Sequence, residues 1–270
     1  AGLEEDIAAH LRENSPAAGM EESWAESLGA WRKRLNVVSS LGAVVLDFND
    51  TIAADQRPHP GALEQIRLLR QAGLTIIIVT GRHYPSIEKS GFLDAFPLTE
   101  RKHLQFITDG WSVHVTFDHS GKPVETPLVP LLENEIRGKI VELISLAVKE
   151  EGLSLESIQT KRARSVSFRL EGNQWEDKER VAQRLRQLFG KEPSLPKGLQ
   201  AYVSSVAVDV TRQDKAEAVR EVLRSLDVYS SEVVVGGDSG MPLGNDRGLV
   251  TRLGAAAAFL VGPSVDALPP

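Results

Sequence analysis

The chain has 270 residues, of which 41% are hydrophobic and 25% are charged, with a formal net charge of -6 and no cysteine. This composition is typical of a folded globular protein and excludes a disordered, collagen-like or disulfide-built class. The lack of cysteine excludes thiolate metal sites and cysteine nucleophiles and fits a reducing compartment. The negative charge argues against a general nucleic-acid binder.

Residues 1–38 predict a helical N-terminal extension made of two pieces. In the second piece Trp24, Leu28, Trp31 and Leu35 recur at spacings of three and four, which predicts a helix packed on the domain, with partner binding as the alternative. The acidic start has no signal-peptide pattern, and no run of about 18 apolar residues follows. We therefore expect a cytoplasmic protein without a membrane partner, and the sequence leaves its oligomeric state open.

Apolar strands alternate with amphipathic helices from residue 42 onward. The first two strands are AVVLDF and LTIIIVT, joined by the helical GALEQIRLLRQAG; HLQFITDG predicts a third strand and WSVHVTF a hairpin arm. After residue 202 the pattern resumes with VSSVAVDVT, the helical DKAEAVREVLRSL, SEVVVGGD and AAAAFLVG. Continuous apolar strands joined by helices predict a doubly wound, Rossmann-like parallel α/β sheet.

The middle of the chain has a different pattern. Two amphipathic helical segments flank ARSVSFRLEG, in which apolar and polar residues alternate as in an antiparallel sheet with one solvated face. This pattern predicts an α+β cap inserted at 125–200 into a core formed by 39–124 and 201–270.

Polar clusters follow the predicted strands or open the helices after them. The clusters are Asp47-Phe-Asn-Asp-Thr51, Thr80-Gly-Arg82, Asp214-Lys215 and Gly237-Asp-Ser-Gly-Met-Pro-Leu-Gly-Asn-Asp246. Ligands of open parallel α/β sheets bind at the carboxyl ends of strands. Together the clusters supply a carboxylate nucleophile, a hydroxyl, a cation and oxygen ligands for a hard metal, which phosphoryl transfer to a carboxylate requires. Taken alone, Asp47 with Thr51 is also compatible with a helix-capping turn.

The four clusters, in this order, resemble the motifs of the haloacid dehalogenase superfamily, in the branch whose cap lies between the second and third motifs. The resemblance covers about residues 42–112 and 203–268. It implies a phosphatase for a sugar phosphate or another small phosphorylated metabolite, with Mg²⁺ as cofactor. The four residues Met-Pro-Leu-Gly inserted in the last motif are similar to the longer loop of eukaryotic phosphomannomutases, so a phosphosugar mutase is a further alternative.

The resemblance assigns roles to individual residues of this chain. The implied catalytic residues are Asp47 as nucleophile, Asn49 at the acid–base position and Thr80 as phosphate ligand. The Lys215 charge is implied to stabilise both the nucleophile and the phosphate. The implied Mg²⁺ ligands are Asp47, the main-chain carbonyl of Asn49, Asp238, Asn245 and Asp246. The expected substrate contacts are Thr51, Gly81 and Arg82 in the core and Lys161 and Arg169 in the cap, where a solvated outer face is the alternative.

Asn49 departs from the superfamily pattern, which places an aspartate here. An amide neither gives nor removes a proton, so general acid–base catalysis is lost from both half-reactions, a factor of about 10²–10⁴ in rate. Three explanations stay open: a natural weak or retired phosphatase, an introduced Asp-to-Asn change, or compensation by Asp50. The main functional alternative is therefore a non-catalytic or regulatory domain that binds a phosphorylated ligand.

Overall fold

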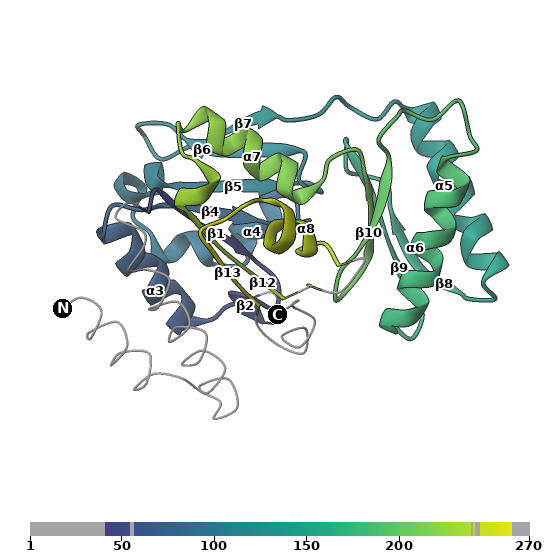
Figure 1. The fold of residues 1–270 in the computed structure, drawn as a ribbon, viewed down its shortest axis with the longest axis horizontal. Coiled ribbons are helices and arrows are strands. Elements are labelled where there is room, and N and C mark those ends of the chain that lie inside the picture. The colour runs from purple at the N-terminus through teal and green to yellow at the C-terminus, as the bar shows by residue number, and fades with distance from the viewer. Residues whose placement is uncertain (1–40, 55–56, 239, 241–243, 261–270) are drawn as a thin grey trace.

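A computed structural model of the protein describes residues 41–54, 57–238, 240 and 244–260. The helical extension predicted over residues 1–38 lies outside this part of the chain. The described residues form a core with a seven-stranded sheet and a cap with a four-stranded sheet, which lie side by side in Figure 1. No helix in the described part is long and apolar enough to cross a membrane.

The core sheet has the strand order β13-β12-β1-β4-β5-β6-β7. Its parallel strands are β1 (Ala43–Asp47), β4 (Thr75–Val79), β5 (Leu104–Thr108), β12 (Val233–Gly237) and β13 (Ala257–Leu260). An antiparallel hairpin of β6 (Val113–Phe117) and β7 (Pro123–Pro127) extends one edge. In the register Asp47 lies opposite Val79 and Leu46 opposite Gly236, so β1, β4 and β12 end at the same edge.

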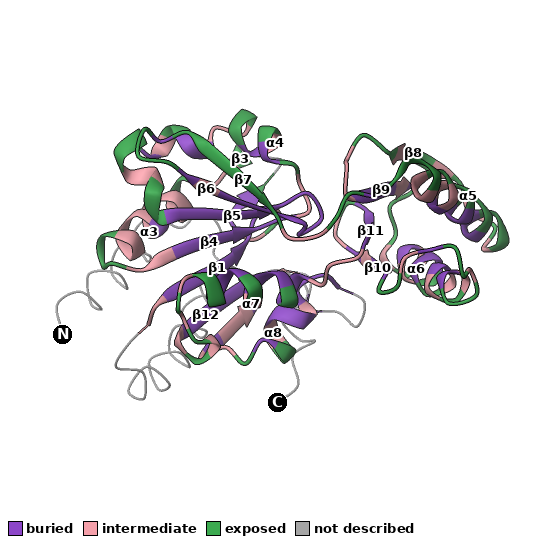
Figure 2. Ribbon diagram, turned by 90° about the horizontal axis from the view of Figure 1, so that it is seen from above, coloured by how far each residue is buried: buried purple, intermediate pink, exposed green. Residues whose placement is uncertain are grey.

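Helices cover both faces of this sheet (Figure 2). The helices α3 (Pro60–Gln71) and α4 (Tyr84–Lys89) pack on one face, and α7 (Lys215–Ser225) and α8 (Arg247–Arg252) pack on the other. Every residue of β1 is buried, because alternate side chains enter the two apolar clusters on opposite faces. This double coverage explains why the predicted strands read as continuous apolar runs.

Short elements complete the core. They are β2 (Ala53–Ala54), β3 (Arg57–Pro58) and the 3₁₀ helices Phe92–Ala95, Leu98–His103 and Ser230–Glu232. Local chemistry sets where the longer helices begin: Pro60 occupies the first turn of α3, where its missing N–H costs nothing, and the Asp214 carboxylate caps α7.

The cap consists of two helices on one face of an antiparallel sheet with the order β10-β11-β9-β8. Its elements are α5 (Asn134–Glu150), β8 (Leu155–Gln159), β9 (Ser165–Leu170), α6 (Trp175–Phe189), β10 (Gln200–Val203) and β11 (Val208–Thr211). Val166, Phe168 and Leu170 alternate along β9 and pack in the cap's own apolar cluster. The helices lie on the side of the sheet away from the core (Figure 1), so the opposite face is turned toward it.

One predicted strand belongs to the other sheet. VSSVAVDVT was expected to resume the parallel core pattern, but Val208–Thr211 pairs antiparallel with β9 and β10 in the cap. Val208 and Val210 bury one face of the strand on the cap helices, and such a short apolar run looks the same in either sheet. A cap ending at residue 200 would divide this sheet, so we propose that the cap extends to about residue 211.

Candidate active site

A buried ion pair joins the end of β1 to the start of α7. Asp47, the last residue of β1, is 3% exposed, and Lys215, the first residue of α7, is fully buried. Lys215 Nζ donates hydrogen bonds to Asp47 Oδ1 and to Asp246 Oδ1. Two residues separated by 168 positions thus meet at the strand ends, where the sequence pattern predicts a site.

Three carboxylates gather around this ammonium group. One oxygen from each of Asp47, Asp238 and Asp246 lies within 4.8 Å of the others. The backbone N–H of Asp238 donates to Asp246 Oδ2 at 2.9 Å, which orients that carboxylate toward the loop after β12. Gly237 is required for this approach, since a Cβ at this position would lie 2.5 Å from Asp246 Cγ. Gly237 and the Asp238 N–H therefore allow Asp246 to lie against the end of β12.

The oxygen atoms of this cluster suit a hard divalent cation. Carboxylate and amide oxygens are the ligands that Mg²⁺ prefers. Asn245 adds a buried amide oxygen, Oδ1, which has no hydrogen-bond partner among the described residues. An orphaned buried acceptor on the residue next to Asp246 fits a cation, because leaving it unsatisfied otherwise costs about 1–3 kcal/mol.

Burial dominates the ionisation of the nucleophile candidate. Burial raises the pKa of Asp47 to about 7, assisted by the charge of Asp246 and opposed by the neighbouring Lys215 ammonium. The pKa of Lys215 is raised by the two carboxylates, which outweigh its own burial. Lys215 therefore stays charged, and Asp47 takes up a proton more readily than an exposed aspartate does.

Asn49 is held by an arginine of the second motif. Its Oδ1 accepts a hydrogen bond of 2.7 Å from Arg82 Nε, and the guanidinium lies 5.3 Å from the centre of the Phe48 ring. The adjacent Asp50 has a positive φ of 55° and is exposed, and its carboxylate accepts a hydrogen bond from Ser205 of the cap. Asp50 is thus directed to the cap, whereas the Asn49 side chain contacts Arg82 of the core.

The second motif lies beside the loop that follows β1. Thr80, at the end of β4, is fully buried, and its Oγ1 accepts a hydrogen bond from the Arg82 backbone N–H at 3.2 Å. The Thr51 hydroxyl is buried without a hydrogen-bond partner among the described residues. Gly81 lies directly under the cap, since a Cβ there would be 3.2 Å from Asp209 Oδ2.

The cap brings further charged groups over the second motif. Asp209 of β11 forms a nearly buried ion pair with Arg162 at 3.2 Å. Burial lowers the pKa of Arg82, and the positive charges of Arg169 and Arg162 lower it further. The charge of Arg169 thus acts on Arg82, and the role of Arg169 at the site stays a prediction. Lys161 is exposed, and its side chain makes no hydrogen bond or ion pair with the described residues, so nothing places it at the site.

Sequence reasoning missed Arg162 and Asp209. Arg162 directly follows Lys161, so the basic segment was recognised from the sequence, and the role of Lys161 stays a prediction. Asp209 interrupts the apolar run VAVDV, and in the cap sheet it shares a face with Ser167, its partner across the ladder. A single charged residue in an apolar strand was therefore the sequence feature that could have identified Asp209 as a candidate site residue.

Comparisons with known proteins bear on the fold. No protein-family model matches the sequence, and a search of curated proteins found no match. A solved structure of an N-terminally truncated, IMP-bound IMP-nucleotidase from Plasmodium falciparum is similar at 15% identity and a TM-score of 0.68, covering 96% of this chain and 76% of that chain. Protein 0175 of Thermoplasma acidophilum is similar at 19% identity and a TM-score of 0.58, covering 84% and 89%.

A third similar structure was reported for a conserved trigonal-bipyramidal intermediate in a phosphoryl-transfer superfamily. It has 15% identity and a TM-score of 0.56 and covers 84% of this chain and 90% of that chain. At such identities the similarity establishes the fold alone, an α/β core with an inserted cap, as the sequence predicts. The roles of single residues and the substrate are matters for proposal.

Proposed function

We propose that the protein is a Mg²⁺-dependent phosphoric monoester hydrolase for a sugar phosphate or a similar small phosphorylated metabolite. The observation that carries this proposal is the cluster in which Asp47 bonds the Lys215 ammonium and lies close to the carboxylates of Asp238 and Asp246. Two anions must meet in phosphoryl transfer to a carboxylate; Lys215 supplies part of the neutralising charge, and a cation held by the carboxylates would supply the rest. The similarity to an IMP-bound nucleotidase supports a small phosphorylated substrate.

The proposed reaction has two steps. An oxygen of ionised Asp47 attacks the phosphorus atom, and the bond from phosphorus to the ester oxygen breaks, which leaves an aspartyl-phosphate and an alkoxide that takes a proton from solvent. Water then attacks this phosphorus and gives up a proton to solvent, the bond from phosphorus to the Asp47 oxygen breaks, and inorganic phosphate and the Asp47 carboxylate are released. Lys215 neutralises the charge of the nucleophile throughout, while the Thr80 hydroxyl and the Arg82 guanidinium are placed to bind phosphoryl oxygens.

The proposed Mg²⁺ ligands are Asp47, Asp238, Asn245 and Asp246, with the main-chain carbonyl of Asn49. When bound, the ion would offset charge on the transferring phosphoryl group. The fit rests on the spacing of the three carboxylates and on the unsatisfied Asn245 Oδ1.

Asn49 limits the proposed turnover, because neither step has a general acid–base. The hydrogen bond from Arg82 holds the amide oxygen as an acceptor, so the position serves as a fixed polar contact. This contact favours the second candidate, a phosphate-ligand-binding domain without catalysis. In both candidates the pocket binds the same class of ligand, and they differ in whether phosphate is released.

We assign substrate selection to the face of the cap that is turned toward the core. Arg162 is fixed there by Asp209, and the charges of Arg162 and Arg169 act on Arg82, so core and cap both contribute guanidinium groups to this region. Such a set suits a substrate with anionic or hydroxyl groups, since guanidinium groups bind oxyanions through paired N–H donors. The contact from Ser205 to Asp50 closes the cap onto the nucleophile loop.

Release of inorganic phosphate from a panel of phosphate esters tests the proposal. The panel of sugar phosphates and nucleoside monophosphates is assayed with and without Mg²⁺ on the protein as it stands, Asn49→Asp and Asp47→Asn. We expect slow Mg²⁺-dependent release, faster release by Asn49→Asp and none by Asp47→Asn. Binding without release by any variant would favour the second candidate, and transfer of phosphate within one sugar without release would indicate a mutase.

A further inference from the structure

A polar cavity lies where the cap meets the core. Its volume is about 580 Å³, and its walls come from α6 and β10 of the cap, the 212–214 connection, and α7 and α8 of the core. Asp47, Thr80, Lys215 and Asp238 are not among its lining residues. The cavity is therefore lined by residues other than these four, and it adjoins the proposed metal site at Asn245.

Positive charge is concentrated in this cavity. Four arginines line it, and the carboxylates in its wall are Asp214 and Glu217. The arginines are Arg186, Arg212, Arg247 and Arg252. A net positive cavity in a chain with a formal charge of -6 is not explained by bulk composition, and it favours an anionic occupant.

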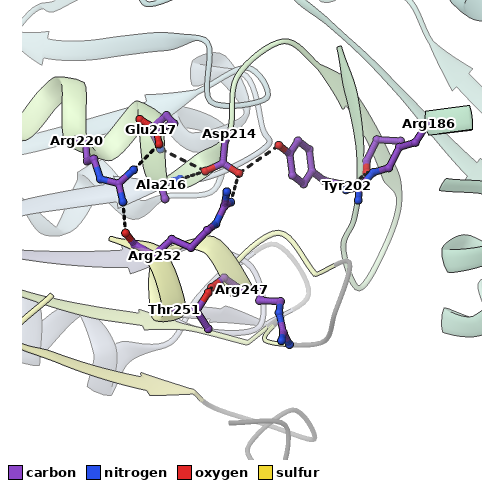
Figure 3. A network of polar contacts seen from close by, with 10 residues as sticks. Arg186, Tyr202, Asp214, Ala216, Glu217, Arg220, Arg247, Thr251 and Arg252 are labelled. Atoms are coloured by element: carbon purple, nitrogen blue, oxygen red, sulfur yellow. Dashed lines mark hydrogen bonds and ion pairs between the residues drawn. The ribbon is translucent and has the colours of Figure 1, made fainter. Parts of the chain in front are cut away.

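The two carboxylates are already engaged by the protein, as Figure 3 shows for Asp214. Asp214 Oδ1 accepts from the backbone N–H groups of Ala216 and Glu217, at 2.9 and 3.3 Å, and Oδ2 accepts from Tyr202 Oη and Arg252 Nη2. Glu217 pairs with Arg220 on the same helix. Neither carboxylate is therefore free to neutralise the remaining arginines.

Arg186 is held in place on the cap wall. Its Nε and Nη2 both donate to the Ala201 carbonyl oxygen, at 3.1 and 2.8 Å, and its guanidinium lies 5.5 Å from the centre of the Tyr202 ring. The Tyr202 ring also packs edge-on against Trp111 of the core, with 5.0 Å between ring centres. One cationic wall is thus fixed before any ligand binds.

Arg212 and Arg247 keep donors available. Among the described residues Arg212 makes no ion pair or side-chain hydrogen bond, and Arg247 makes one long contact, from Nη1 to the Gly240 carbonyl oxygen at 3.4 Å. Guanidinium groups with unused N–H donors bind phosphate oxygens in pairs. A cavity of this size accommodates a metabolite rather than a macromolecule.

We propose that this cavity is a second anion-binding site, for a small molecule that carries a phosphate or diphosphate group. Arg212 and Arg247 supply the binding donors, and Arg186 and Arg252 supply the fixed positive surroundings. Because Arg186 belongs to the cap and Arg247 to the core, the occupant joins the two lobes. The cavity also touches the residues directly before Lys215 and Asp246, so occupancy acts on the active site through Asp214 and Asn245.

Titration calorimetry with inorganic pyrophosphate in metal-free buffer tests this site. The samples are the Asp47→Asn protein, in which turnover is excluded, and the same protein carrying Arg212→Gln with Arg247→Gln. Arg224→Gln provides a matched control, because Arg224 is an exposed arginine of α7 that does not line the cavity. We expect the double replacement to remove one binding event or to weaken it at least tenfold, and Arg224→Gln to leave it unchanged.

Two results would overturn the proposal. One is pyrophosphate binding that is the same with and without Arg212 and Arg247. The other is equal weakening by the double replacement and by Arg224→Gln, which would indicate a general loss of charge. Far-ultraviolet circular dichroism and thermal unfolding of each variant show whether the fold is retained, and Arg212→Lys with Arg247→Lys should restore part of the binding if charge at these positions is what matters.

Discussion

Arg82 donates a hydrogen bond from Nε to Asn49 Oδ1 at 2.7 Å, while its guanidinium stacks at 5.3 Å on the ring of Phe48. The contact ties the loop after β1 to the loop after β4, so the first and second motifs are positioned together. An aspartate in place of Asn49 would accept the same hydrogen bond with a negative charge. The local structure is thus already shaped for a carboxylate at position 49.

Restoring that carboxylate should raise turnover. We expect Asn49→Asp to increase kcat for phosphate release by about 10²–10⁴, the usual contribution of general acid–base catalysis. Asn49→Ala is the matched control and should give no increase, because it removes the amide without adding a titratable group. Steady-state phosphate release with Mg²⁺ measures both. Equal rates for Asn49→Asp, Asn49→Ala and the unchanged protein would contradict the role of position 49.

Removal of the buried ammonium should destabilise the fold. Lys215→Met leaves Asp47 and Asp246 as uncompensated buried carboxylates, which typically costs about 3–5 kcal/mol in the free energy of unfolding. The loss should be smaller at pH 6 than at pH 8, because protonation of Asp47 then removes one charge. Urea denaturation without metal measures it, with the exposed Lys102→Met as control. A loss no larger than that of the control would refute the structural role of the pair.

Mg²⁺ binding should depend on pH through Asp47. Burial raises the pKa of Asp47 from 3.8 to about 7 in the folded, metal-free protein. The folded state therefore binds more protons than the unfolded state between these values, and the metal-free free energy of unfolding falls as pH rises through them. Mg²⁺ binds the ionised carboxylate, so its affinity should rise up to about tenfold per pH unit below pH 7 and level off above.

Calorimetric titration of Mg²⁺ at several pH values measures this dependence. Repetition in buffers of different ionisation enthalpy counts the protons released on binding. Asp47→Asn should abolish the pH dependence over this range, since it removes the titrating group. A Mg²⁺ affinity that does not change between pH 5 and pH 7 would contradict the assignment of Asp47 as a ligand.

A methyl group at Gly237 should disturb the metal site. Its Cβ would lie 2.5 Å from Asp246 Cγ and Oδ2, so Gly237→Ala must displace this carboxylate. We expect the free energy of unfolding to fall by about 1–3 kcal/mol and Mg²⁺ binding to weaken. Gly138→Ala, on the exposed surface of α5 with no atom within 4 Å of the new Cβ, should instead stabilise by about 0.5–1 kcal/mol. Unfolding and Mg²⁺ titration of both variants make the comparison, and normal Mg²⁺ affinity in Gly237→Ala would show that Asp246 is not needed in this position.

Replacement of a cap arginine should affect substrate binding more than chemistry. In the Asn49→Asp background we expect Arg162→Gln to raise KM about 10- to 100-fold with little change in kcat, because it removes a charged hydrogen-bond donor from binding. Arg180→Gln, which removes an exposed arginine of α6, is the control. A fall in kcat with unchanged KM would mean that Arg162 acts in the transition state and not in selection.

Much of the core could be predicted from the sequence, because a strand that is buried on both faces of a sheet is a continuous apolar run. The runs AVVLDF, LTIIIVT and SEVVVGG predicted parallel strands, and the structure confirms them as β1, β4 and β12. VSSVAVDVT was wrongly placed in the core, since a four-residue strand does not reveal which sheet supplies its partners. Arg162 was not recognised from the sequence, because the direction of a side chain in a loop depends on tertiary packing.

The sequence by itself determined the α/β core, the inserted cap and the order of four polar clusters, because strand and helix periodicity and motif spacing are local properties. Only the tertiary structure decided which of these groups meet. The Lys215 ammonium pairs with Asp47 and Asp246, Asn49 is bound by Arg82, and Asp209 fixes Arg162 over Gly81. The cavity lined by Arg186 and Arg247 also depends on the tertiary structure, because the cavity walls come from segments that are distant in the sequence.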